Sequence, residues 1–195
     1  MGRVEGLLLL HLKLSGFAGR QKRHGADVLR GALVLSIGAL DALVLDSVVA
    51  AIPRAEREGA LGRTVAKWVK EDAESSLTLL GDREPAGKVA NLCRRRLGQP
   101  TFQRAAAIED VIRDVAQREG FWPRAAEILS SDGSVWDAAT VKGKLDEIVA
   151  REHGIAYRGD LLPDSTTTRR IQRPYVEEAV RVTRAVGSAV VETLA

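Results

Sequence analysis

The pattern of apolar and polar positions along the chain predicts helices and almost no strands. Long stretches are rich in Ala, Leu, Glu and Arg, whereas Gly and Pro mostly fall between them. A short first helix is expected over residues 4–16, and a much longer one from Ala26 to Ile52, ended by Pro53. The long helix is apolar on nearly all sides, which is typical of a central buried element.

Boundary residues and apolar periodicity predict the remaining helices. Ser134 with Asp137 resembles a capping box, and Gly154 allows the helix that follows to end. The other expected helices cover residues 63–80, residues 84–97, residues 101–120, and a last stretch that begins at Pro174 after a polar loop. Two of the helices present apolar faces, made of Val141, Leu145, Ile148 and Val149 and of Val176, Val180, Val186 and Val190.

These elements predict one all-α domain over residues 1–195, a helical bundle around the long central helix, with residues 1–20 as a peripheral helix. A hydrophobic content of 45% is enough to bury a core of ordinary size. Residues 31–52 have the length of a membrane span but contain Asp41 and Asp46, each costing about 2.5–3.5 kcal/mol at a bilayer centre. We therefore expect a buried core helix and no membrane contact.

The amino-terminal stretch and the cysteine usage point to the cytoplasm. The apolar run "GLLLLHL" is interrupted by His11 and Lys13 before the core of a signal peptide would be complete. A single cysteine, Cys93, excludes an intramolecular disulfide framework and a metal site made of several cysteines. We expect a cytoplasmic protein that carries neither a metal nor another cofactor.

The charge balance limits how the chain can bind nucleic acid. Twenty-nine Lys and Arg against twenty-six Asp and Glu give a net charge of only +3, so RNA contacts must come from local patches. The candidate RNA-binding residues are Arg94, Arg95 and Arg96 in one patch and Arg169, Arg170 and Arg173 in another. The alternative for each of these patches is a helix face that is exposed to solvent and binds no RNA.

The stretch "IVAREHGIAYRGD", residues 148–160, gathers candidate chemistry near an expected helix end. Cutting RNA without metal requires a group that takes the 2′-hydroxyl proton, a group that protonates the leaving oxygen, and a cation for the phosphate. Arg151, His153 and Tyr157 are suited to parts of that task. The alternative is a solvated helix terminus whose cations complement the helix dipole.

Three segments carry a resemblance to a known family. They are "HGADVLRGALVLSIGALDALVLD", "FQRAAAIEDVI" followed by "FW", and "VKGKLDEIVAREHGIAYRGDLLP", in this order along the chain. From about residue 24 to residue 195 the chain resembles the HEPN superfamily, particularly its RiboL-PSP-HEPN type. The resemblance implies an all-α homodimer in which two signature motifs face one another and cut RNA without metal. It also implies a toxin or defence effector, with an antitoxin or another defence-system protein as partner.

The signature of that family, Arg-Arg-Asn-x-Ile-x-His-x-x-Asp, is altered in this chain. Arg151 matches the first arginine and Asp160 the aspartate, whereas Glu152 stands at the second arginine, His153 at the asparagine and Tyr157 at the catalytic histidine. Asp41 is expected to support the signature arginine. A tyrosine, whose pKa is about 10, is a poor general base at neutral pH.

Two functions follow from this altered signature. One is an endoribonuclease in which Arg151 stabilises the phosphate and His153 or Tyr157 handles protons, with Glu152 and Asp160 as supporting residues. The other is a dimer that has lost cleavage and binds RNA or a protein. Whether the departures are natural or were introduced is left open by the sequence.

Overall fold

The computed structural model describes residues 2–15, 20–59, 102–117, 120–131, 133–163 and 165–195. Within these ranges the protein is all-helical, as predicted, and its extended pairing is limited to one isolated bridge between Leu161 and Thr168. The helices are α1 (Gly2–Ser15), α2 (Arg20–Arg57), α5 (Ala105–Ala116), α6 (Phe121–Ser130), α7 (Ala138–Arg158) and α8 (Arg173–Leu194).

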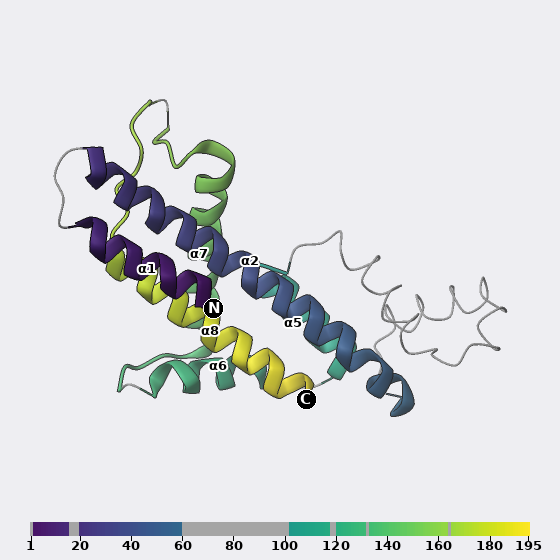
Figure 1. Cartoon of the computed structure of the whole chain (residues 1–195). Coiled ribbons are helices and arrows are strands. Elements are labelled where there is room, and N and C mark those ends of the chain that lie inside the picture. The colour runs from purple at the N-terminus through teal and green to yellow at the C-terminus, as the bar shows by residue number, and fades with distance from the viewer. Residues whose placement is uncertain (1, 16–19, 60–101, 118–119, 132, 164) are drawn as a thin grey trace, which may run out of the picture.

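The long helix α2 is the central element of the described fold. It contacts α1, α5, α7 and α8, and Figure 1 shows α1 lying alongside its first half. Its buried face runs along most of its length and includes Leu29, Leu33, Ile37, Leu40, Val44, Val48 and Ile52. The predicted buried faces of α7 and α8 are confirmed, since all eight predicted positions are buried.

One stretch of α2, His24–Ile52, is long and apolar enough to cross a membrane by length and composition. Core helices of soluble proteins pass the same test, and much of α2 is buried against its neighbours. The absence of membrane contact therefore stays a prediction.

The end of α2 differs from the expected boundary. The helix continues through Pro53 to Arg57, although proline removes one helical hydrogen bond. The Arg54 guanidinium donates to the main-chain carbonyls of Leu194 and Ala195, which ties this last part of α2 to the end of α8. Tertiary contacts thus outweigh the local cost. The helices predicted over residues 63–80 and 84–97 lie outside the described residues.

The helix predicted over residues 101–120 is shorter, and a second helix follows it. The first, α5, ends at Ala116 because Gln117 adopts a left-handed conformation with φ 47°. Gly120, with φ 94°, then precedes α6. This helix was not predicted, and it buries Phe121 and Trp122 in the core.

The predicted start of α7 also needs correction. Asp137 is the capping residue, since its side chain accepts a hydrogen bond of 2.7 Å from the Thr140 N–H. Ser134, the residue expected to cap, instead donates to the Leu129 carbonyl and accepts from the Trp136 indole.

Two aspartates from neighbouring helices hold the segment that leads into α5. Asp41 of α2 accepts a hydrogen bond of 2.5 Å from the Phe102 N–H, and Asp146 of α7 accepts one of 3.0 Å from the Ala105 N–H. Arg104, at the cap position of α5, makes no side-chain cap bond, so these carboxylates satisfy main-chain donors from outside the helix. Gln103 is therefore anchored on both sides.

Candidate functional site

The carboxyl end of α7 carries the residues of the altered signature. The helix does not end at Gly154, as predicted, but continues to Arg158. Gly159 and Asp160 have φ values of 59° and 62°, and two consecutive left-handed residues end the helix. The correction matters because Arg151, His153 and Tyr157 consequently all lie on regular helix, where side-chain directions follow the helical repeat.

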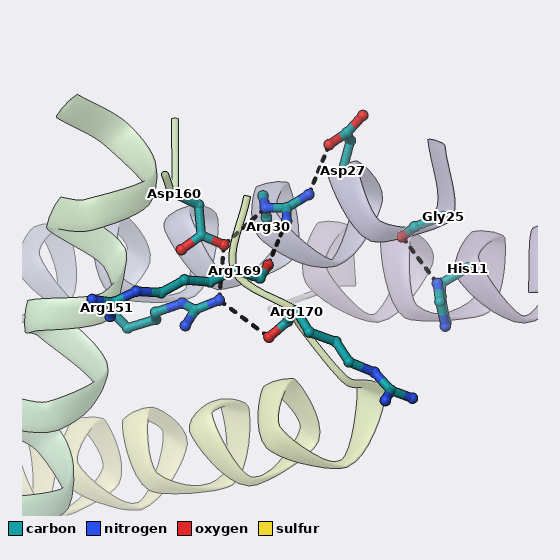
Figure 2. A network of polar contacts seen from close by, with 8 residues as sticks. All are labelled: His11, Gly25, Asp27, Arg30, Arg151, Asp160, Arg169 and Arg170. Carbon is teal, nitrogen blue, oxygen red and sulfur yellow. Dashed lines mark hydrogen bonds and ion pairs between the residues drawn. The ribbon is translucent and has the colours of Figure 1, made fainter. Parts of the chain in front are cut away.

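Asp160 lies between two arginines from helices that are distant in sequence (Figure 2). Its Oδ2 accepts hydrogen bonds of 2.9 Å from Arg30 Nε and 2.8 Å from Arg151 Nη2. The Asp160 side chain is only 1% exposed, and the two arginine side chains are 12% and 17% exposed. This buried cluster, Arg30–Asp160–Arg151, joins the first half of α2 to the end of α7.

The cluster also holds the extended segment before α8. Arg30 Nη2 donates to the Arg169 carbonyl at 2.8 Å, and Arg151 Nη2 lies 3.4 Å from the Arg170 carbonyl. In Figure 2 the Arg170 side chain points away from Asp160. The main chain of residues 169–170 is thus fixed by the cluster, while the Arg169 and Arg170 side chains are exposed.

Sequence reasoning missed Arg30 and gave Asp41 a different role. Asp41 was expected to support the signature arginine, but it accepts the Phe102 N–H, and the carboxylate bound to Arg151 is that of Asp160. The available signal was Arg30 itself, a cation on a helix that is otherwise largely apolar and buried. Such a cation needs a partner, although its spacing could not identify Asp160.

A second cluster surrounds His153. Its Nε2 lies 3.0 Å from Gln103 Oε1 and 3.6 Å from Glu152 Oε2. The Tyr157 ring meets the His153 ring edge to face, with centroids 5.7 Å apart and planes at 81°. Tyr157 is 82% exposed and His153 38% exposed, so both can reach a ligand in solution.

The structure does not bring all predicted catalytic residues together in one chain. Residues two apart on an α-helix are rotated by about 200° around its axis, so their side chains point to nearly opposite sides. Accordingly, Arg151 binds Asp160 on one side of α7, whereas His153 binds Gln103 elsewhere on the helix. Within the chain, Arg151 and His153 therefore point to different sides of α7.

Glu152, at the position of the second signature arginine, is a buried carboxylate. The residue is 6% exposed, and its Oε2 has no hydrogen-bond partner among the described residues. Burial raises the pKa of Glu152, while the charge of neighbouring His153 opposes part of this shift.

Replacing Glu152 by Gln is expected to remove a pH-dependent loss of stability. The raised pKa means that the folded protein holds this proton more tightly than the unfolded chain does. The free energy of unfolding therefore falls as pH rises from the ordinary glutamate pKa through the raised value. Urea unfolding from acidic to neutral pH should show the unchanged chain losing stability relative to Glu152→Gln. If the free energies of unfolding of the two proteins change in parallel with pH, the pKa of Glu152 is not raised by folding.

A surface cleft lies beside the Arg30–Asp160–Arg151 cluster. Its volume is about 920 Å³, and His11, the first half of α2 and residues 168–174 line it. Four arginines contribute to the lining, namely Arg30, Arg169, Arg170 and Arg173, together with the single acidic residue Asp27. Asp27 is already paired with Arg30, so the cleft carries a net positive charge. We call it the arginine cleft.

The structure places only one of the two predicted groups of RNA-binding arginines. Arg169, Arg170 and Arg173 share the arginine cleft, although Arg173 is also paired with Glu177 at 2.6 Å. Arg94, Arg95 and Arg96 lie outside the described residues.

Within the part of the chain that the structure describes, no group of three or more His, Cys, Asp or Glu could hold a metal ion.

Comparisons with protein-family models, with curated proteins and with solved structures found no match to this chain.

Proposed function

We propose that this chain is a cytoplasmic RNA-binding protein of the HEPN type, and that the RNA backbone lies in the arginine cleft. The observation that carries the proposal is the gathering of four arginines on one cleft from two distant parts of the chain. Arg30 and Arg173 are engaged within the protein, whereas the side chains of Arg169 and Arg170 are exposed and can reach a phosphate. Guanidinium groups are well suited to bind phosphate, because their donors match its oxygens in pairs. The HEPN assignment is supported by the three ordered sequence resemblances.

The arrangement around Arg169 and Arg170 suits phosphate binding. Their carbonyls are used by Arg30 and Arg151, which fixes the main chain without occupying the two exposed side chains. A preorganised pair of cations loses less entropy on binding than two cations on a free loop would.

Replacing both Arg169 and Arg170 by Ala is expected to weaken RNA binding and its salt dependence. Each phosphate contact on single-stranded nucleic acid contributes about 0.7 to the slope of log affinity against log salt. Loss of two contacts should reduce that slope by about 1.4. Fluorescence anisotropy with a labelled single-stranded RNA, titrated at several salt concentrations, measures both quantities.

A matched control removes the same charge elsewhere. Arg113 and Arg124 lie outside the arginine cleft and pair with acidic residues on the surface. The Arg113→Ala/Arg124→Ala variant should retain the slope of the unchanged chain. An equal loss in both double variants would indicate a general effect of net charge, and no loss in either would reject the arginine cleft as the RNA site.

A metal-independent endoribonuclease is the second candidate function, and it adds chemistry to the same RNA binding. The half-buried His153 favours this second function, because imidazole is the side chain best suited to proton transfer near neutral pH. It is bonded to Gln103 and lies close to Glu152. Since Arg151 and His153 bind partners on different sides of α7, this candidate requires a homodimer that combines residues of two protomers. An antitoxin or another defence-system protein is the further partner proposed for such an enzyme.

A further inference from the structure

The contacts of His153 bear on which of its ring nitrogens carries the proton. Both neighbours of Nε2 present oxygen atoms, Gln103 Oε1 at 3.0 Å and Glu152 Oε2 at 3.6 Å. The amide oxygen of Gln103 only accepts hydrogen bonds, so it favours a proton on Nε2. Glu152 Oε2 is too distant for a hydrogen bond, and its ionised form favours the same proton through its negative charge. Among the described residues, the hydrogen bond of the His153 ring is made through Nε2, and Nδ1 has no hydrogen-bond partner.

We infer that Gln103 and Glu152 are positioning residues that fix His153 as its Nε2–H tautomer, leaving Nδ1 as the atom that exchanges protons with a bound ligand. This inference deepens the second candidate function and rests on it for its chemical consequence. The hydrogen-bonded tautomer itself can be tested without RNA.

The surrounding structure gives the arrangement its rigidity. Asp41 and Asp146 hold the main chain on either side of Gln103, so the amide is presented from an anchored segment. Glu152 precedes His153 on α7, and its side chain is 8% exposed, so packing restrains its position. Helices α2 and α7 and the segment that leads into α5 thus contribute to the orientation of one imidazole.

His11 provides an internal contrast. Its Nδ1 lies 3.0 Å from the Gly25 carbonyl, which can only accept, so His11 is expected to carry its proton on Nδ1. His24, whose side chain is exposed, serves as a reference for an imidazole that averages between tautomers. The three histidines of the chain should therefore give three different signatures in one spectrum.

Nδ1, which has no hydrogen-bond partner among the described residues, is suited to the first step of RNA cleavage without metal. It accepts the proton of a ribose 2′-hydroxyl, and the 2′-oxygen forms a bond to the adjacent phosphorus. The bond from phosphorus to the 5′-oxygen then breaks. The proton held at Nδ1 passes through water to that leaving oxygen, which restores the neutral imidazole. Fixing the tautomer removes the competing arrangement in which Nδ1 is already protonated.

The test is long-range nitrogen–proton NMR of the folded, full-length chain near neutral pH, with His153→Ala used to assign the signals. The unchanged chain should show His153 as a single Nε2–H tautomer and His11 as the opposite one. In the Gln103→Leu/Glu152→Gln variant, His153 should show the averaged signature of His24. The same variant should lose RNA cleavage by on the order of 10²-fold, while its RNA affinity stays unchanged. Circular dichroism confirms that each variant is folded.

The outcomes of this test distinguish a failure of the proposed His153 tautomer from a failure of the proposed endoribonuclease activity. An averaged or Nδ1–H signal for His153 in the unchanged chain would overturn the inference, whatever the chain does to RNA. Retention of a single Nε2–H signal in the double variant would also overturn it, because other contacts would then fix the ring. A single Nε2–H signal in a chain that does not cut RNA would reject the endoribonuclease and, with it, the proton-exchanging role of Nδ1.

Discussion

Replacing Asp160 by Asn is expected to lower the free energy of unfolding by about 3–5 kcal/mol, the usual cost of removing one partner from a buried ion pair. The carboxylate is 1% exposed and is shared by Arg30 and Arg151, which would be left close together without a negative charge between them. Asn is the appropriate replacement because it keeps the shape and tolerates the left-handed φ of 62° at this position. Urea unfolding followed by circular dichroism measures the effect.

Asp27 provides the matched control for Asp160. It bonds the same arginine, Arg30, at 3.0 Å, but its side chain is 67% exposed. Solvent screening makes such a pair worth less than about 1 kcal/mol, so Asp27→Asn should be nearly neutral. If the two variants lost equal stability, the buried cluster would not be the feature that joins α2 to α7.

Replacing His153 by Ala is expected to reduce RNA cleavage by about 10²- to 10⁴-fold, the range typical of a lost acid–base group. The reaction should be assayed with EDTA present throughout, since the proposed chemistry uses side chains and no metal. RNA affinity should change little, because His153 does not line the arginine cleft. Gel analysis of single-stranded and structured RNA measures cleavage, and anisotropy measures binding.

Two further variants make the His153 result specific. His24→Ala removes an exposed histidine elsewhere and should cut RNA like the unchanged chain. Tyr157→Phe keeps the ring that contacts His153 and removes only the hydroxyl. A loss of cleavage in this variant would show that the Tyr157 hydroxyl, and not a proton returned by His153 through water, protonates the leaving oxygen. If the unchanged chain and all of these variants are folded and none cuts RNA, the endoribonuclease is rejected and RNA binding is the remaining function.

The structure also changes how the altered signature should be probed. Tyr157 is 82% exposed, so Tyr157→His is compatible with the fold and is a fair test of a restored imidazole at that position. Glu152 is buried, and Glu152→Arg would place a larger guanidinium where a carboxylate oxygen already lacks a described partner. Tyr157→His should therefore be made alone, because a loss of folding caused by Glu152→Arg would hide the chemistry of a restored imidazole.

The sequence determined the helical class and much of the core, because both depend on local patterns. Apolar positions three and four residues apart identified the buried faces of α7 and α8, including Leu145 and Val186. The apolar composition of α2 likewise predicted its central place. The apolar periodicity of a single helix shows which of its faces is buried, whichever neighbouring helix packs against that face.

Helix boundaries were less well predicted, because tertiary contacts compete with local signals. Pro53 did not end α2, whose last part is tied to α8 by Arg54. Gly154 lies inside α7, and the helix ends at Gly159, where the chain turns toward the buried carboxylate of Asp160. A glycine permits a helix to end, but packing decides which glycine does so.

Only the tertiary structure decided which charged and polar groups meet. The sequence identified Arg151, His153 and Asp160 as candidates, but not that Arg30, 130 residues before Asp160, shares its carboxylate. Nor did it show that Gln103 bonds His153 from another part of the fold. Residue type determines what a side chain can donate or accept, whereas the packing of α2, α5 and α7 determines which donor lies within 3 Å of which acceptor.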